Sequence, residues 1–195
     1  NDKSRQLMKI LSDILAMEDS MYHSVLYTHM LFVFANAKNI NSDNIRTMYF
    51  DVEDDPYARI ITNEILRTNK VLGNLLNKHI DPMHTRDVLI VRINQIIKIV
   101  NMRNREILNS LRNGITHTNI TVTDTGIEIF DRQDNTDENS KISFRCKTTF
   151  EKMDKFLLEI ESKEKQEELL DIDEFLEELR TICGNSQAIE LFALY

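Results

Sequence analysis

The chain has 195 residues, a formal net charge of −8 at pH 7 and 42% hydrophobic residues, enough for a core. This size fits one ordinary domain, and the composition excludes a disordered chain. Only four glycines and two prolines are present, too few for the many turns of a β-sandwich or β-barrel. No stretch is long and apolar enough for a transmembrane span, and Cys146 and Cys183 lack a metal-ligand spacing. We expect a mainly helical protein of the reducing cytoplasm, without a membrane partner.

The N-terminal region carries a helical pattern. Apolar residues recur at three- and four-residue steps through residues 4–36, with a possible break at residues 17–21. Asparagine, serine and aspartate then dominate residues 36–44, which predicts a loop. The region is therefore expected to form one long helix or two shorter ones before that loop.

Two helix starts are marked by an acidic residue directly before proline, at Asp55-Pro56 and at Asp81-Pro82. The apolar stripe after Pro56 predicts a helix to about His79. The stripe after Pro82 is longer, and neither glycine nor proline interrupts it before Gly114. It predicts a helix of about 25–30 residues.

The pattern then changes to that of β-strands. Residues 119–123 and 127–130 alternate β-branched and polar side chains on either side of a short turn, which predicts a hairpin. Residues 131–140 contain no apolar side chain and predict a loop. Residues 141–147 predict a third strand.

Helical periodicity returns from Thr149 to about residue 160, and again over residues 169–179. The whole pattern predicts an all-α fold, an antiparallel helical bundle. In this prediction residues 1–195 form a single helical domain, and residues 119–147 form a small β-hairpin or three-strand appendage.

Charge is distributed unevenly along the chain. Residues 86–112 hold six basic and two acidic residues, whereas residues 150–180 hold five basic and twelve acidic ones. A locally basic helix in an acidic protein can bind an anionic ligand, because the short-range field decides local affinity. The alternative is that this stretch is only the solvated polar face of a surface helix.

The end of the predicted long helix carries the residues best suited to chemistry, Arg112, Asn113 and His117. An imidazole titrates near neutral pH and can accept or donate a proton during RNA cleavage. A guanidinium presents a fork of donors to a phosphate, and the asparagine amide can orient either group. The alternative is an ordinary helix end, with Gly114 in the left-handed conformation and Arg112 beside the negative end of the helix dipole.

Helix geometry restricts how Arg112 and His117 can cooperate. Five residues of ideal helix separate them by about 140° around the axis and about 7.5 Å along it. They cannot meet at one phosphate while the helix is undisturbed. Either Gly114 breaks the helix, or two copies of the segment meet across a dimer axis.

This segment resembles the motif of the HEPN superfamily (higher eukaryotes and prokaryotes nucleotide-binding), which is arginine, a polar residue, three further residues and histidine. Arg112, Asn113 and His117 match it position by position. The resemblance implies a helical bundle with metal-independent ribonuclease activity, hence an RNA-binding hydrolase without a cofactor, and a site built from two motif copies by homodimerisation. Many members are toxins of toxin–antitoxin pairs, with a cognate antitoxin protein, or effectors of antiviral defence and abortive infection.

The resemblance covers about residues 54–160, and the N-terminal third has no counterpart in it. Family members often add an acidic residue from a neighbouring helix, and Glu64 is the candidate here. Two histidines near an aspartate, His79, His84 and Asp87, suggest a metal site, but we interpret them as polar residues of a helix–helix turn.

Two functions remain open from the sequence. The first is a HEPN-type endoribonuclease that uses Arg112 and His117. The second is a catalytically inert HEPN-like helical protein that binds a protein partner through its acidic C-terminal helices.

Overall fold

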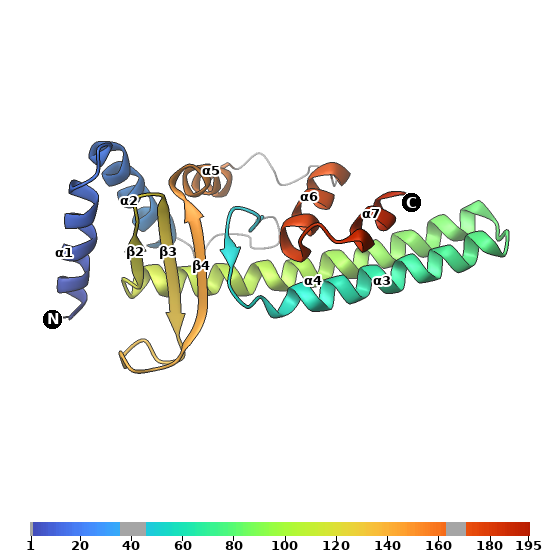
Figure 1. Cartoon of the computed structure of the whole chain (residues 1–195), viewed down its shortest axis with the longest axis horizontal. Coiled ribbons are helices and arrows are strands. Elements are labelled where there is room, and N and C mark those ends of the chain that lie inside the picture. Colours follow the sequence, from blue (N-terminus) through green and yellow to red (C-terminus); the bar gives the residue numbers. More distant parts are fainter. Residues whose placement is uncertain (1, 36–45, 163–170) are drawn as a thin grey trace. The chain divides into compact units, whose positions relative to one another are not determined.

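The computed structural model describes residues 2–35, 46–162 and 171–195 (Figure 1). These residues are mostly helical and include one small antiparallel sheet, so the predominance of helix predicted from composition is confirmed. The loop predicted at residues 36–44 lies outside the described ranges. The elements in chain order are α1 (Asp2–Leu15), α2 (Ser20–Ala35), β1 (Asp51–Val52), α3 (Pro56–Asn77), α4 (Pro82–Thr116), β2 (Ile120–Val122), β3 (Gly126–Arg132), β4 (Ile142–Thr149), α5 (Phe150–Glu161), α6 (Ile172–Cys183) and α7 (Gln187–Ala193).

The chain forms two compact units, each with its own apolar core. The first comprises the described residues of 1–53 and 105–166, and the second those of 54–104 and 167–195. The long helix α4 contributes residues to both units. The motif Arg112–His117 therefore belongs to the first unit.

The sheet of the first unit has the strand order β1-β4-β3-β2, and every neighbouring pair is antiparallel. The predicted hairpin and third strand are β2, β3 and β4, and β1 adds a short fourth strand that the sequence pattern did not indicate. The sheet is part of the core rather than an appendage, because its inward side chains pack into the main apolar cluster. These are Ile120, Val122, Ile127, Ile129 and Cys146.

Local signals set the ends of several elements in the first unit. The predicted break near residues 17–21 separates α1 from α2. Thr149 caps α5, since its side chain accepts a hydrogen bond from the Lys152 N–H. The helix therefore starts where the periodicity predicts.

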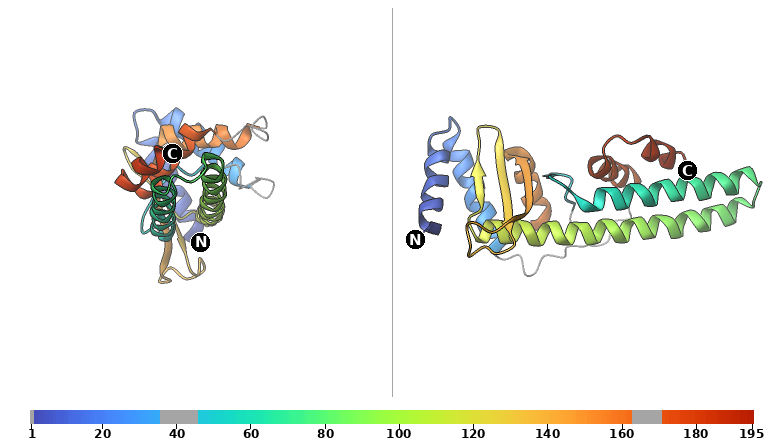
Figure 2. Two further views of the ribbon diagram at one scale, coloured as in Figure 1. Left: turned by 90° about the vertical axis from the view of Figure 1, so that its right-hand side faces the viewer. Right: turned by 60° about the horizontal axis from the view of Figure 1, so that its bottom comes forward.

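The second unit contains α3, the N-terminal part of α4, α6 and α7. Asp55 caps α3 by accepting a hydrogen bond from the Tyr57 N–H, and Pro56 occupies the first helical turn, as the sequence predicts. Figures 1 and 2 show α3 and this part of α4 side by side and antiparallel. The core lies between these two helices and α6 and α7; its fully buried members include Ile61, Ile65, Leu72, Ile96, Leu179 and Ile189.

Candidate active site

The helix α4 continues through Gly114 and ends at Thr116, so it spans 35 residues rather than the predicted 25–30. The left-handed residue at its end is Thr118, with φ of 58°. The Asn119 N–H donates to the Gly114 carbonyl at 2.8 Å and the Thr118 N–H to the Ile115 carbonyl at 3.1 Å, a Schellman arrangement. The reading in which Gly114 stops the helix in a left-handed conformation is therefore wrong.

Gly114 has a different role, which is to allow close packing between α4 and β3. A Cβ atom at this position would lie 2.6 Å from the Phe130 carbonyl oxygen and 2.8 Å from the Ile129 side chain. Any side chain would therefore push the helix away from the strand. Gly114 fixes the end of α4 against the sheet, and with it the backbone of the motif.

A buried carboxylate connects the motif to the sheet. Asp131, at the end of β3, is 7% exposed, although the sequence pattern assigns it to a polar loop. Its Oδ2 accepts a hydrogen bond from Asn113 Nδ2 at 3.3 Å, and its Oδ1 accepts from Asn135 Nδ2 at 2.8 Å and from the Arg132 N–H at 3.0 Å. Asn135 in turn accepts from Asn119 Nδ2 at 2.8 Å. The Asn113 amide is thus held by the sheet.

His117 follows the last residue of α4 and is exposed. Its backbone N–H donates to the Asn113 carbonyl at 2.9 Å, and its carbonyl accepts from the Thr118 hydroxyl at 2.6 Å. His117 lines a hollow of about 370 Å³ in the first unit. The described residues that line this hollow, all but one of them polar, are Asp2, Lys3, Gln6, His117, Asn119, Phe130, Arg132, Asn135, Thr136, Glu138 and Asn139. We call it the His117 pocket.

The sequence pattern did not indicate two cationic residues of this pocket, Lys3 and Arg132. Lys3 comes from the first turn of α1 and Arg132 from the end of β3. The Arg132 guanidinium donates to the Ser140 carbonyl at 2.8 Å and lies 5.2 Å from the centre of the Phe130 ring. These residues are distant from His117 in sequence, and only the fold brings them to it.

Arg112 is half-buried and is not among the described residues that line the His117 pocket. Since α4 is helical from Arg112 to Thr116, the separation of about 140° around the axis stands. One chain therefore does not bring Arg112 and His117 to one point. The sequence offered two ways to bring Arg112 and His117 together, a helix break at Gly114 or a second copy of the chain. The unbroken helix excludes the first.

The basic stretch of residues 86–112 does not form a single solvent-exposed face. Arg103 is buried in the second unit, where its Nε lies 2.6 Å from Asp55 Oδ2. The acidic candidate Glu64 also lies in the second unit and pairs with Arg67 at 2.7 Å. Arg103 therefore contributes to the structure of the second unit, and Glu64 has a local ion-pair partner.

Among the described residues, no group of three His, Cys, Asp or Glu side chains is arranged to hold a metal ion, and His79, His84 and Asp87 are exposed. None of the described helices combines the length and the apolar character needed to cross a membrane. Comparison with protein-family models, curated proteins and solved structures gave no match. The function must therefore be argued from the geometry of the site.

Proposed function

We propose that this protein is a metal-independent endoribonuclease of HEPN type, with a site composed of Arg112 from one copy and His117 from another. The observation that carries this proposal is the position of His117, exposed at the end of α4 and facing a polar pocket that contains Lys3 and Arg132. The pocket offers an imidazole and two cations to a phosphate group, alongside the carboxylates of Asp2 and Glu138.

The reaction we propose is internal transesterification of RNA. The ribose 2′-oxygen attacks the adjacent phosphorus, the bond from phosphorus to the 5′-oxygen breaks, and a 2′,3′-cyclic phosphate and a 5′-hydroxyl result. His117 takes the proton from the 2′-hydroxyl or gives one to the leaving 5′-oxygen. Arg112 stabilises the negative charge that builds on the phosphoryl oxygens.

Single-stranded RNA is the expected substrate. The attacking 2′-oxygen must come into line with the leaving 5′-oxygen, and the stacked A-form duplex resists this rotation. An unstacked strand can also place a base against an exposed aromatic or guanidinium group. Phe130 and Arg132 line the His117 pocket, but the guanidinium groups of Arg132 and Arg145 already lie 5.2 Å and 5.8 Å from the centre of the Phe130 ring, so a base would have to displace one of them.

The separation of Arg112 and His117 on an undisturbed helix supports a composite site. A two-fold axis can bring Arg112 of one copy toward His117 of the other. Asn113 supports this arrangement because its hydrogen bond to Asp131 fixes the intervening turn of α4. Its role is then to position the motif rather than to touch the phosphate.

The test is an RNA-degradation assay in EDTA that compares the wild-type chain with His117→Ala, both checked for folding by circular dichroism. We expect wild-type cleavage to persist in EDTA and to fall about 10²–10⁴-fold in the variant. Cleavage that disappears with EDTA indicates a metal nuclease, and equal cleavage by both proteins indicates a contaminant or another site.

The biological setting that we propose, a toxin or an antiviral effector in the cytoplasm with a cognate antitoxin protein, rests on the resemblance alone. Expression of the wild-type chain in its host should arrest growth, and His117→Ala should not. Harmless expression of the wild-type chain, at a level detected by immunoblot, contradicts this part of the proposal.

A second candidate is a protein-binding role without catalysis. The burial of Arg103 against Asp55 favours it, because one of the six basic groups of residues 86–112 is then unavailable to RNA. Absence of cleavage by a folded wild-type dimer on several RNAs would favour this function over the ribonuclease.

A further inference from the structure

The His117 pocket contains a buried amide that the proposed catalysis does not use. Asn119 lines this pocket and is 8% exposed. Its main-chain groups are occupied, because its N–H donates to the Gly114 carbonyl at 2.8 Å and its carbonyl accepts from the Phe130 N–H at 3.1 Å. The side chain of Asn119 is therefore the part of this residue that a ligand can use.

Hydrogen bonds fix which way the Asn119 amide faces. The Asp131 carboxylate only accepts, so Asn135 donates to it through Nδ2 and leaves its own Oδ1 as an acceptor. The Arg132 main-chain N–H, which only donates, lies 3.3 Å from the same Asn135 Oδ1. Asn119 must therefore donate to Asn135 Oδ1, and its Nδ2 does so at 2.8 Å.

The Asn119 carbonyl oxygen, Oδ1, is then left as an acceptor. It accepts no hydrogen bond from the part of the chain that the structure describes. A buried acceptor lowers its free energy when water or a ligand supplies a donor. The His117 pocket thus presents one oriented acceptor, set back in its wall.

A nucleobase with an exocyclic amino group matches this acceptor. The amino group of adenine or cytosine donates and projects from the edge of the ring, so it can reach a recessed oxygen. Uracil carries a carbonyl oxygen in place of the cytosine amino group, and two oxygens of this kind repel one another. The ring N–H of uracil lies between two carbonyl oxygens and cannot approach a recessed acceptor as closely.

We infer that the His117 pocket is a base-recognition site, in which Asn119 Oδ1 accepts a hydrogen bond from the exocyclic amino group of a base such as adenine or cytosine, rather than uracil. The inference rests on the proposed function, because it takes single-stranded RNA as the ligand. Asn119 then determines specificity: it selects the base, while His117 transfers a proton.

The other groups of the pocket agree with this assignment. The Arg132 guanidinium is held by the Ser140 carbonyl at 2.8 Å and by the Phe130 ring, and its remaining N–H groups can donate to the phosphate beside the bound base. The carboxylates of Asp2 and Glu138 also line the pocket. They are acceptors, so they too favour a base edge that donates over the carbonyl edge of uracil.

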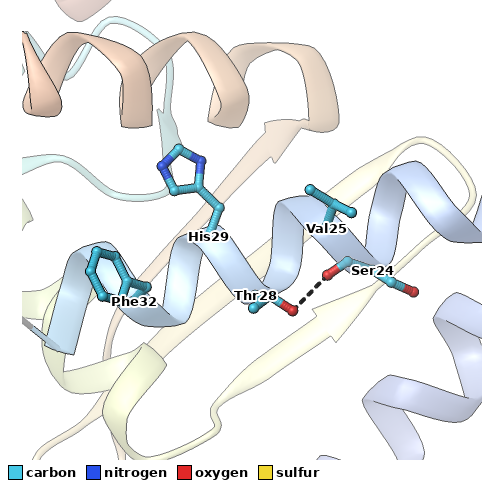
Figure 3. Close-up of a pocket in the computed structure, with 5 residues that line it drawn as sticks. All are labelled: Ser24, Val25, Thr28, His29 and Phe32. Atoms are coloured by element: carbon cyan, nitrogen blue, oxygen red, sulfur yellow. Dashed lines mark hydrogen bonds between the residues drawn. The ribbon is translucent and has the colours of Figure 1, made fainter.

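A second hollow of the first unit does not offer this combination. It has a volume of about 530 Å³ and runs along α2 (Figure 3), where its lining residues are Ser24, Val25, Thr28, His29 and Phe32. None of these is lysine, arginine, asparagine or glutamine, and His29 Nε2 already lies 2.8 Å from Glu161 Oε1. The combination of a cation with an oriented amide belongs to the His117 pocket and not to the α2 hollow.

The first test measures binding without cleavage. Deoxyoligonucleotides lack the 2′-oxygen and cannot undergo the proposed reaction, so the full chain is titrated into short labelled oligomers of cytosine and of uracil and followed by fluorescence anisotropy. We expect the wild type to bind the cytosine oligomer about three- to tenfold more tightly, the size of one net hydrogen bond. Oligomers of adenine and of unsubstituted purine, which differ only in the amino group, should differ in the same direction.

The second test removes the acceptor. Asn119→Ala should bring the affinities for the cytosine and uracil oligomers to within about twofold of one another, mainly by weakening cytosine binding. The matched control is Asn94→Ala, the same change at an exposed asparagine of α4 in the second unit, and it should keep the preference. Circular dichroism and thermal melting establish that both variants are folded. The comparison of adenine with purine uses the wild type and does not depend on the folding of any variant.

Three results overturn the inference: no measurable binding of the oligomers, equal wild-type affinities within either pair, or an amino preference that folded Asn119→Ala retains. The last result would assign the preference to the carboxylates of Asp2 and Glu138. The inference and the ribonuclease fail separately. Amino-dependent binding without RNA cleavage contradicts only the ribonuclease, whereas cleavage of uracil RNA as fast as of cytosine RNA contradicts only the base recognition.

Discussion

Asn113 donates its side-chain amide to the buried carboxylate of Asp131, with 3.3 Å between Asn113 Nδ2 and Asp131 Oδ2. This bond joins the last turns of α4 to the end of β3, and Gly114 allows the two elements to approach. The motif is therefore held by the sheet as well as by its own helix. In the proposed ribonuclease, this hold sets the direction in which the segment from Arg112 to His117 faces.

Replacement of the Asp131 carboxylate should destabilise the first unit. Asp131→Ala removes the acceptor of the Asn113 and Asn135 side-chain amides; because Asn113 is exposed and Asn135 is half-buried, water can replace part of it, and we expect the free energy of unfolding to fall by about 0.5–1.5 kcal/mol. Urea unfolding measures the change. The matched control is Asp124→Ala in the exposed β2–β3 turn, which should change stability by less than about 0.5 kcal/mol. Equal effects of the two variants would show that the Asp131 network contributes nothing specific.

Replacement by alanine should change the stability of the protein in opposite directions at the two helical glycines, Gly114 and Gly73. In Gly114→Ala the new Cβ meets the Phe130 carbonyl oxygen at 2.6 Å, so a loss of about 1–3 kcal/mol is expected from overpacking. In Gly73→Ala the nearest atom, the Tyr195 hydroxyl oxygen, is at 3.8 Å, and helix propensity should raise stability by up to about 1 kcal/mol. Thermal melting of both variants checks this prediction. A Gly114→Ala variant as stable as wild type would contradict the close contact between α4 and β3.

The composite site predicts complementation between inactive variants. Arg112→Ala and His117→Ala should each lower cleavage about 10²–10⁴-fold alone, and Arg112→Lys should not restore it, because a point charge lacks the planar fork of donors. If Arg112 and His117 act across the dimer, mixing the two alanine variants should recover about a quarter of wild-type activity, since half of the random dimers retain one of two sites.

The measurement is cleavage of single-stranded RNA in EDTA after the mixed proteins have exchanged subunits. Arg112→Ala mixed with itself is the control for residual activity. No recovery in a mixture that has demonstrably formed heterodimers would indicate that both residues act within one chain, against the composite site.

Burial should make Cys146 unreactive in the folded protein. Desolvation raises the pKa of its thiol from an ordinary value of 9.0 to about 12, so at pH 8 it holds roughly a thousandfold less thiolate than an unperturbed cysteine. Alkylation by iodoacetamide, followed by mass spectrometry, should label Cys146 in urea and spare it in buffer. Rapid labelling of Cys146 in the folded protein would contradict its burial in the sheet.

The same raised pKa gives a pH dependence of stability. Above pH 9.0 the unfolded chain loses the Cys146 proton while the folded chain keeps it, so the folded state is progressively disfavoured between pH 9.0 and about 12. Cys146→Ala should lessen this decline in urea unfolding measured across that range. An unchanged slope would mean that Cys146 does not titrate differently in the two states.

The sequence by itself determined features that depend on neighbouring residues. Asp55 before Pro56 predicted the start of α3, and Thr149 marked the return of helical periodicity at the start of α5, because a cap is a contact between residues two or three apart. The motif residues Arg112, Asn113 and His117 were singled out by their chemistry, by their place at the end of the predicted long helix and by the family resemblance. Their assignment to RNA cleavage remains a proposal.

Only the tertiary structure decided the features that depend on distant residues. The local sequence around Gly114 predicts a helix stop, but α4 continues to Thr116. Gly114 instead allows the helix to contact the backbone of Phe130 in the sheet. Asp131 reads as a loop residue but is buried at the end of β3, where it accepts a hydrogen bond from Asn113, eighteen residues earlier. Lys3 reaches the His117 pocket from α1, more than a hundred residues earlier in the sequence. Sequence periodicity reports which side of a helix is apolar, and packing decides what each side meets.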